Sequence, residues 1–165
     1  MNIFRRIFVP VDGSPPSNEA VTFAVRLAGE WSSELTFAYV VDADRLVCAE
    51  VPGLDVGGIL HSAADDGRRL LERASAAALA AGVRAHTHLR EGRTVETLLD
   101  LAKSDQSELI VIGSHGRSGF RRLMMGSTTE ALLRVCRIPV LVVHAPDVLA
   151  GNAEPVKLGE LRAAL

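Results

Sequence analysis

The chain has 165 residues, a length that suits one domain with one core, and its 48% of hydrophobic residues is enough to build that core. Its 18 basic and 20 acidic residues give a net charge of -2, which argues against a nucleic-acid-binding coat and an anionic-membrane binder, since both need a basic surface. Aromatic residues make up only 4%, so stacking platforms for single-stranded nucleic acid are scarce.

The first predicted element is a strand at 7–11, a short apolar run that stops at the turn residues 12–14. A helix is expected to follow at once. Ser14 can cap it, Pro15 suits its first turn, and apolar residues recur at helical spacing as far as Trp31.

The next predicted elements are a strand, a loop and a long helix. The apolar run 35–41 has the length of a strand, and 42–58 contains Pro52 and three glycines, which predicts a mobile loop. A helix is expected over 61–81, with Gly82 placed as its C-terminal cap. The predicted inward face of this helix consists of Leu70, Ala74, Ala77, Ala78 and Ala81.

The rest of the chain alternates strands and helices in the same way. In the first of these strands Val83, Ala85, Thr87 and Leu89 are expected to face one way. The predicted elements are a strand at 83–89, a helix at 94–103, a strand at 109–112, a helix at 127–135 and a strand at 139–143.

This alternation predicts the α/β class, with a five-stranded parallel sheet and helices on both faces. In such sheets a ligand binds beyond the carboxyl ends of the strands, where the strand order reverses. If the order is 3-2-1-4-5, the reversal lies between the first and fourth strands. Turn-rich segments follow both of these strands, at 12–14 and at 113–116, so we expect a ligand site there.

The glycine-rich segment 113–127 has the chemistry of a phosphate site. Glycines let the backbone come close to a ligand, and exposed amides in such a loop can hold phosphate oxygens. Gly126 and Ser127 open the next helix, whose N-terminus offers free N–H groups and the positive end of a dipole. Further positive charge is available nearby, from Arg117, Arg121 and Arg122.

Purely structural explanations account for the same residues. Ser127 and Glu130 have the spacing of a capping box, which by itself would explain the serine. Gly113 and Gly116 suit ordinary turns, and the arginines suit a solvated surface. Capping and phosphate binding are also compatible at one helix start.

The spacing Gly113-x2-Gly116-x9-Gly126-Ser127 resembles the nucleotide-binding signature of the universal stress protein family. The likeness extends from Arg6 to about His144, and it includes the ends of the first, second and fifth strands. It implies a Rossmann-like fold of the adenine nucleotide alpha hydrolase type. It also implies a domain over 1–145, with a loosely attached tail at 146–165.

The resemblance further implies an ATP site. Asp12 would lie near the adenine and ribose, the backbone of Val40 would contact the adenine edge, and Gly113 would lie beside the ribose. Mg²⁺ would be held mainly by the phosphates, without a protein metal site. The ATP-binding residues implied are Pro10, Val11, Asp12, Val40, Gly113, Gly116, Gly126, Ser127 and Thr128.

The function favoured is an ATP-binding regulatory or stress-response module, with protein partners that the sequence does not name. It is expected to form a homodimer through the apolar last strand, 139–144. Two alternatives stay open: a slow ATPase or nucleotidyl-transfer enzyme, and a dimeric interaction scaffold without ligand. The chain lacks a P-loop sequence and a general base beside a nucleophile, so no catalytic residue is assigned.

Cellular location is inferred from the cysteines and the N-terminus. Cys48 and Cys136 form neither a CxxC pair nor a disulfide framework, which favours a reducing compartment. Arg5 and Arg6 lie within the first predicted strand, and no apolar run reaches the roughly 18 residues of a membrane helix. We therefore expect a cytoplasmic protein with no signal peptide and no membrane span.

Overall fold

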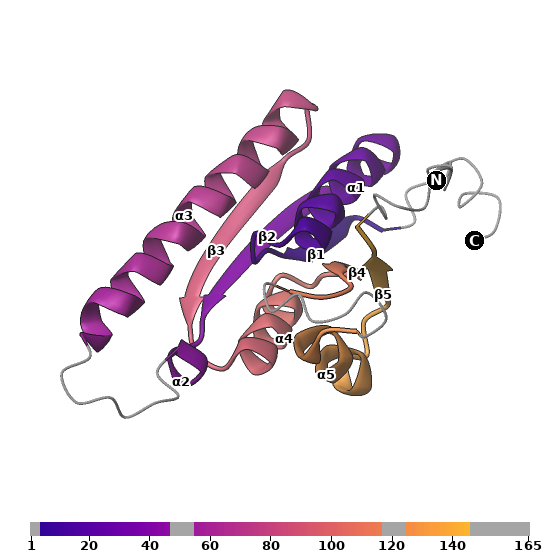
Figure 1. The fold of residues 1–165 in the computed structure, drawn as a ribbon. Helices are drawn as coiled ribbons and strands as arrows, with labels where there is room; N and C mark the ends of the chain where they lie inside the picture. Colours follow the sequence, from indigo (N-terminus) through magenta and orange to yellow (C-terminus); the bar gives the residue numbers. More distant parts are fainter. Residues whose placement is uncertain (1–3, 47–54, 117–124, 146–165) are drawn as a thin grey trace.

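The computed structural model describes residues 4–46, 55–116 and 125–145. Strands and helices alternate along them (Figure 1). In chain order the elements are β1 (Arg6–Pro10), α1 (Pro15–Trp31), β2 (Glu34–Val41), α2 (Ala43–Leu46), α3 (Val56–Ala80), β3 (Ala85–Glu91), α4 (Thr94–Ser104), β4 (Leu109–Gly113), α5 (Ser127–Val135) and β5 (Val140–Val143).

The strands form one parallel sheet in the order β3-β2-β1-β4-β5, which confirms the predicted class and strand order. On one side of β1 lie β2 and then β3, and on its other side lie β4 and then β5. The order therefore reverses between β1 and β4. Their carboxyl ends lie beside each other, with the end of β2 next to that of β1.

Helices cover both faces of the sheet (Figure 1). The core beneath α1 and α3 takes Ile7 and Val9 from β1, whereas the core beneath α4 and α5 takes Phe8. All three side chains are fully buried. Alternate residues of one strand thus fill opposite cores, as the two-residue period of a strand dictates.

The start of α1 confirms the predicted cap. Ser14 is the N-cap residue, its hydroxyl accepts a hydrogen bond from the Ser17 N–H at 3.3 Å, and Pro15 occupies the first helical position. The cap fixes the direction in which the chain leaves β1. It also holds the Ser14 side chain inside the protein, where it is 3% exposed.

The expectation of a loop over the whole of 42–58 is wrong. The helix α2 occupies Ala43–Leu46, and α3 begins at Val56, five residues before the predicted start. Residues 47–54 lie outside the described residues. The Asp55 carboxylate caps α3 by accepting the Gly58 N–H at 2.9 Å. A Cβ at Gly58 would lie only 2.4 Å from that carboxylate, so this glycine belongs to the cap.

The inward face of α3 also differs from the prediction. Leu71, Ala74 and Ala78 are buried, whereas Ala77 and Ala81 are exposed. Gly67 is buried too, and it packs so closely on Tyr39 of β2 that a Cβ there would lie 2.4 Å from the ring. The run of alanines around 74–81 carries little information about which side faces the core.

The two edges of the sheet differ in character. On β3, the exposed residues include two charged ones, Arg90 and Glu91. Thr87 of this strand is exposed as well. At the other edge, β5 consists only of half-buried valine and leucine. No helix among the described residues is long and apolar enough to cross a membrane.

Candidate functional site

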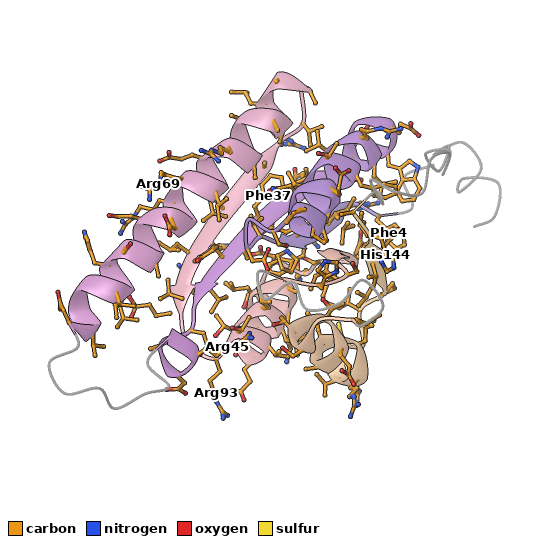
Figure 2. The ribbon with its side chains drawn as sticks, viewed as in Figure 1. Phe4, Phe37, Arg45, Arg69, Arg93 and His144 are labelled. Carbon is orange, nitrogen blue, oxygen red and sulfur yellow. The ribbon has the colours of Figure 1, made fainter. Side chains whose placement is uncertain are left out.

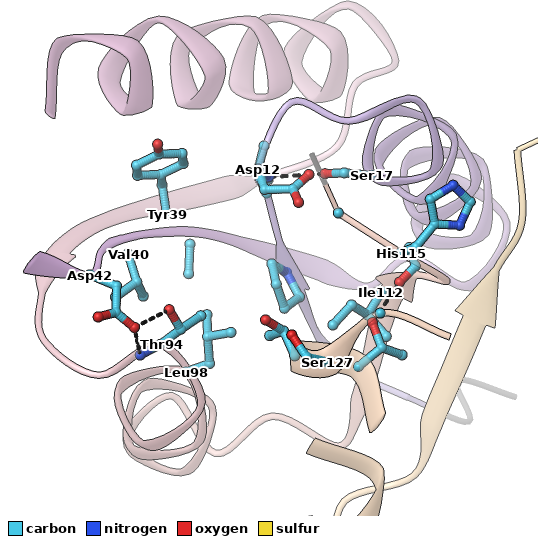
Figure 3. Close-up of a pocket in the computed structure, with 18 of the residues that line it drawn as sticks. Asp12, Ser17, Tyr39, Val40, Asp42, Thr94, Leu98, Ile112, His115 and Ser127 are labelled. Atoms are coloured by element: carbon cyan, nitrogen blue, oxygen red, sulfur yellow. Dashed lines mark hydrogen bonds between the residues drawn. The ribbon is translucent and has the colours of Figure 1, made fainter. Parts of the chain in front are cut away.

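A pocket of about 340 Å³ lies at the carboxyl ends of the central strands (Figure 3). Its walls come from the ends of β1, β2 and β4 and from the first turns of α4 and α5. The structure brings all nine predicted site residues to this one pocket. They are Pro10, Val11, Asp12, Val40, Gly113, Gly116, Gly126, Ser127 and Thr128.

One wall of the pocket is apolar. It is formed by Pro10, Ala38, Val40, Leu98 and Ile112, which come from three neighbouring strands and from α4. All of them except Val40 are buried. Such a wall suits a flat, mainly apolar group, since most ligand pockets combine an apolar lining with a few polar groups.

The turn after β1 builds part of the polar wall. The Asp12 N–H donates to Ser17 Oγ at 3.1 Å (Figure 3). The Ser14 N–H donates to the Asp12 carboxylate at 2.9 Å. The Ser14 hydroxyl in turn donates to the His115 carbonyl at 3.2 Å. These bonds join the turn after β1 to the segment after β4, so both polar loops are held together.

The two ends of the glycine-rich segment are joined to each other. The Gly126 N–H donates to the Ser114 carbonyl at 2.8 Å. A Cβ at Gly126 would lie 2.9 Å from His115 Cα, and one at Gly116 would lie 2.6 Å from the Asp12 carboxylate. Gly126 has no room for a side chain because its neighbours are backbone atoms, whereas at Gly116 only the Asp12 carboxylate would have to move.

Three predicted cationic residues of this segment fall on 117–124, which lies outside the described residues. They are Arg117, Arg121 and Arg122.

The capping-box explanation for Ser127 is wrong. Gly126 occupies the N-cap position, Ser127 is the first residue of α5, and no side chain caps the helix. Glu130 instead pairs with Arg134 one turn further on, at 2.5 Å. The Ser127 side chain is exposed at the pocket, where it stands beside the free N–H groups of the first turn.

Thr129 anchors α5 to the sheet, a contact that the sequence analysis missed. Its hydroxyl is buried and donates to the Gly113 carbonyl at 2.9 Å, which satisfies a backbone acceptor at the end of β4. This bond fixes the height of the helix start above the sheet. Ser127 and Thr128, which precede it, are thereby held at the rim of the pocket.

Gly113 has a packing role in addition to its place at the pocket. A Cβ there would lie 2.7 Å from Pro16 C and 2.7 Å from Ser17 N, both in the backbone of α1. The glycine thus lets the end of β4 contact the first turn of α1 directly. Its position next to the ribose, implied by the family resemblance, stays a prediction.

Asp42, just beyond β2, was not predicted as a pocket residue. Its carboxylate accepts the Thr94 hydroxyl at 2.7 Å and the Thr94 N–H at 2.9 Å, which caps α4 from a distant strand (Figure 3). It also accepts the Arg45 N–H at 3.3 Å. Burial acts to raise the pKa of Asp42, but the bonds from Thr94 and Arg45, with the Arg45 charge, hold that pKa below its ordinary value of 3.8.

The lowered pKa gives Asp42 a pH-dependent role in stability. Because the folded pKa lies below the unfolded one, the contribution is present above pH 3.8 and is lost as pH falls through the folded pKa. We expect Asp42→Asn to lower the free energy of unfolding by about 1 kcal/mol at pH 7. The difference from the parent shrinks in acid.

Urea denaturation at several pH values measures this effect. The control is Asp100→Asn, which changes an exposed carboxylate on α4. A loss for Asp42→Asn that stayed constant from pH 7 down to pH 3 would contradict the electrostatic explanation.

The fold and the pocket together define the class of doubly wound α/β proteins with a site at the strand-order reversal. The model of the universal stress protein family matches residues 3–144, and the chain belongs to that family.

Two curated relatives come from distant organisms. Universal stress protein MJ0531 of Methanocaldococcus jannaschii is 32% identical over 149 residues, which covers 88% of this chain and 85% of the relative. Universal stress protein YxiE of Bacillus subtilis is 32% identical over 148 residues, which covers 86% of this chain and all of the relative. The chain is therefore similar to these relatives over nearly their whole length.

Solved structures give the same family. A universal stress protein from Burkholderia pseudomallei matches with a TM-score of 0.72 at 30% identity, over 87% of this chain and 98% of that one. A universal stress protein in complex with cAMP matches at 0.65 and 23% identity, over 87% and 99% of the two chains. An Arabidopsis thaliana family member with AMP bound matches at 0.62 and 14% identity, over 86% and 92%. The last two likenesses concern the fold alone.

Proposed function

We propose that this protein binds ATP with Mg²⁺ in the pocket described above and acts as a nucleotide-dependent regulatory module of the stress response in the cytoplasm. The observation that carries the proposal is the convergence of all nine predicted site residues on one pocket. The pocket has an apolar wall at one side and backbone N–H groups and hydroxyls at the other. An adenine nucleotide has a matching polarity, since its base is flat and largely apolar at its faces and its phosphates are anionic.

The arrangement favours one orientation of the nucleotide. The base fits against the apolar wall of Val40, Leu98 and Ile112. The phosphates then reach the first turn of α5, where the free N–H groups and the positive end of the helix dipole attract an anion. Gly116 and Gly126 line the pocket there without side chains, and Ser127 adds an exposed hydroxyl. Two family members solved with cAMP and AMP support adenine nucleotides as the ligand class.

A magnesium ion would depend on the nucleotide for most of its ligands. Within the described ranges, no group of three or more His, Cys, Asp or Glu side chains is placed to hold a metal. Two carboxylates, Asp12 and Asp42, line the pocket. This number suits Mg²⁺, which is commonly held by one or two carboxylates together with phosphate oxygens and water.

The test is a calorimetric titration of nucleotide-stripped protein with Mg-ATP, AMP and cAMP. Saturable binding of Mg-ATP is the expected result. No heat at several temperatures from a folded protein would contradict the proposal and favour a scaffold without ligand. Phosphate release, measured at saturating ATP, separates a binding module from a slow ATPase.

We also propose that the protein forms a homodimer through residues 139–144. The edge strand β5 carries only apolar side chains, and no strand in the described part of the chain pairs with its outer backbone groups. An apolar edge of this kind favours pairing with a second copy. Light scattering at micromolar concentration tests the proposal, and a monomer under those conditions would contradict it.

A further inference from the structure

A second cavity of about 310 Å³ adjoins the pocket, and we call it the outer chamber. Both cavities are lined by Asp42, Arg45, Thr94, Ser127 and Thr128, so they meet along one shared wall. The shared wall includes the end of the pocket at which the proposed function places the phosphates. The outer chamber therefore lies where a nucleotide with additional phosphates would extend.

Within this shared wall, the Arg45 side chain links α2 to α5. It belongs to the short helix α2, and its backbone N–H is held by the Asp42 carboxylate at 3.3 Å. Its guanidinium Nη1 donates to Thr128 Oγ1 of α5 at 3.2 Å. The side chain is exposed, and it lies with Arg93 at the end of the sheet next to α2 (Figure 2).

The position of this guanidinium favours an anion beside it. Thr128 is in the first turn of α5, where the helix dipole is positive, and a cation is better placed at a helix C-terminus. The acidic residue of that turn, Glu130, is engaged by Arg134. A phosphate between Arg45 and the helix start would contact both positive groups. It would also accept a stronger hydrogen bond from the guanidinium than a threonine hydroxyl does.

A second arginine of the outer chamber provides a matched comparison. Arg93 carries the same charge, and its Nη1 lies 2.9 Å from the Glu96 carboxylate. It lines the outer chamber, but it does not line the first pocket, which we call the inner pocket. Among the described residues that line the inner pocket, Arg45 is the only one with a permanent positive charge.

We propose that Arg45 is a specificity-determining residue, which contacts the terminal phosphates of the bound nucleotide and makes the site prefer ATP to AMP. The inference rests on the proposed function, because it assumes that an adenine nucleotide occupies the inner pocket. Guanidinium suits this task, since its planar fork of donors matches two phosphate oxygens at once. AMP has a single phosphate, which the first turn of α5 holds without reaching the outer chamber.

The experiment compares Mg-ATP and AMP binding by calorimetry, at one ionic strength, for the parent, Arg45→Ala and Arg93→Ala. We expect Arg45→Ala to weaken Mg-ATP binding about 10-fold, the effect of one lost charge-assisted hydrogen bond, and to change AMP binding less than about 2-fold. Arg93→Ala should change either affinity less than about 2-fold. An intermediate loss of Mg-ATP affinity is expected for Arg45→Lys, which keeps the charge without the fork.

The outcomes separate this inference from the proposed function. A parent that binds Mg-ATP while Arg45→Ala binds it equally well would overturn the inference and leave the nucleotide site intact. Equal losses for Mg-ATP and AMP would also overturn it, as would equal losses in the two arginine variants, which would indicate general electrostatics. A parent that binds no adenine nucleotide would overturn both.

Discussion

A Gly126→Val variant is expected to bind Mg-ATP at least roughly 100-fold more weakly than the parent, the effect of losing two or more hydrogen bonds to a charged ligand. Any Cβ at position 126 would lie 2.9 Å from His115 Cα and 3.3 Å from Gly116 N. Both neighbours are backbone atoms, which have no alternative rotamer, so the backbone at 115–116 or the start of α5 must move. That movement displaces the N–H groups proposed to hold the phosphates.

The measurement is the titration described above, with circular dichroism to establish that the variant is folded. The matched control is Gly29→Ala, in the last turn of α1, where a Cβ would meet its nearest neighbour at 3.9 Å in ordinary contact. The control should bind as the parent does. If the folded Gly126→Val variant bound Mg-ATP with parental affinity, the phosphates could not lie at this helix start.

The second large effect is expected on stability. Gly113→Ala should lower the free energy of unfolding by about 3 kcal/mol, the upper part of the range for overpacking. The added methyl would lie 2.7 Å from the backbone of Pro16 and Ser17, so the end of β4 must separate from α1. The same shift would strain the bond from Thr129 to the Gly113 carbonyl.

Urea denaturation provides the measurement, with Gly29→Ala as the control once more. The control adds the same methyl within a helix, at ordinary contact distance from its nearest neighbour. Alanine is favoured over glycine there, so the control should stabilise the protein by a few tenths to about 1 kcal/mol. A Gly113→Ala variant with parental stability but weakened ATP binding would assign the glycine to the ligand instead of to packing.

Much of the fold was predictable because the informative signals are local. Short apolar runs that end in turn residues mark the strands, and helices between them require a parallel sheet. The turns at 12–14 and 113–116 follow the two strands between which the order reverses, so the position of the pocket could be predicted. The structure confirms the order, and with it the convergence of these two turns.

The errors arose where one local pattern suits two structures. Ser127 and Glu130 have capping-box spacing, but the glycine before them can also take the N-cap position, and in the structure it does. Gly57 and Gly58 suggested a loop, although a helix accommodates glycine in a first turn capped by Asp55.

Other features were beyond local reasoning because they join distant parts of the chain. The bond between Asp42 and Thr94 spans 52 residues, and the one between Thr129 and Gly113 spans 16. Arg45 reaches Thr128 across 83 residues. Each contact depends on the relative heights of helices above the sheet, which hydrophobic periodicity does not specify. These long-range bonds fix the rim of the pocket.

The unlike edges of the sheet bear on how copies of the protein can associate. If β3 of one copy paired with β5 of the next, every added copy would leave the same two edges free, and the assembly would grow as an open filament. The exposed charged residues Arg90 and Glu91 on β3 make that contact unfavourable, whereas two apolar β5 edges meet without this cost. In the proposed dimer, charge on the β3 edge would therefore favour a closed pair over an open filament.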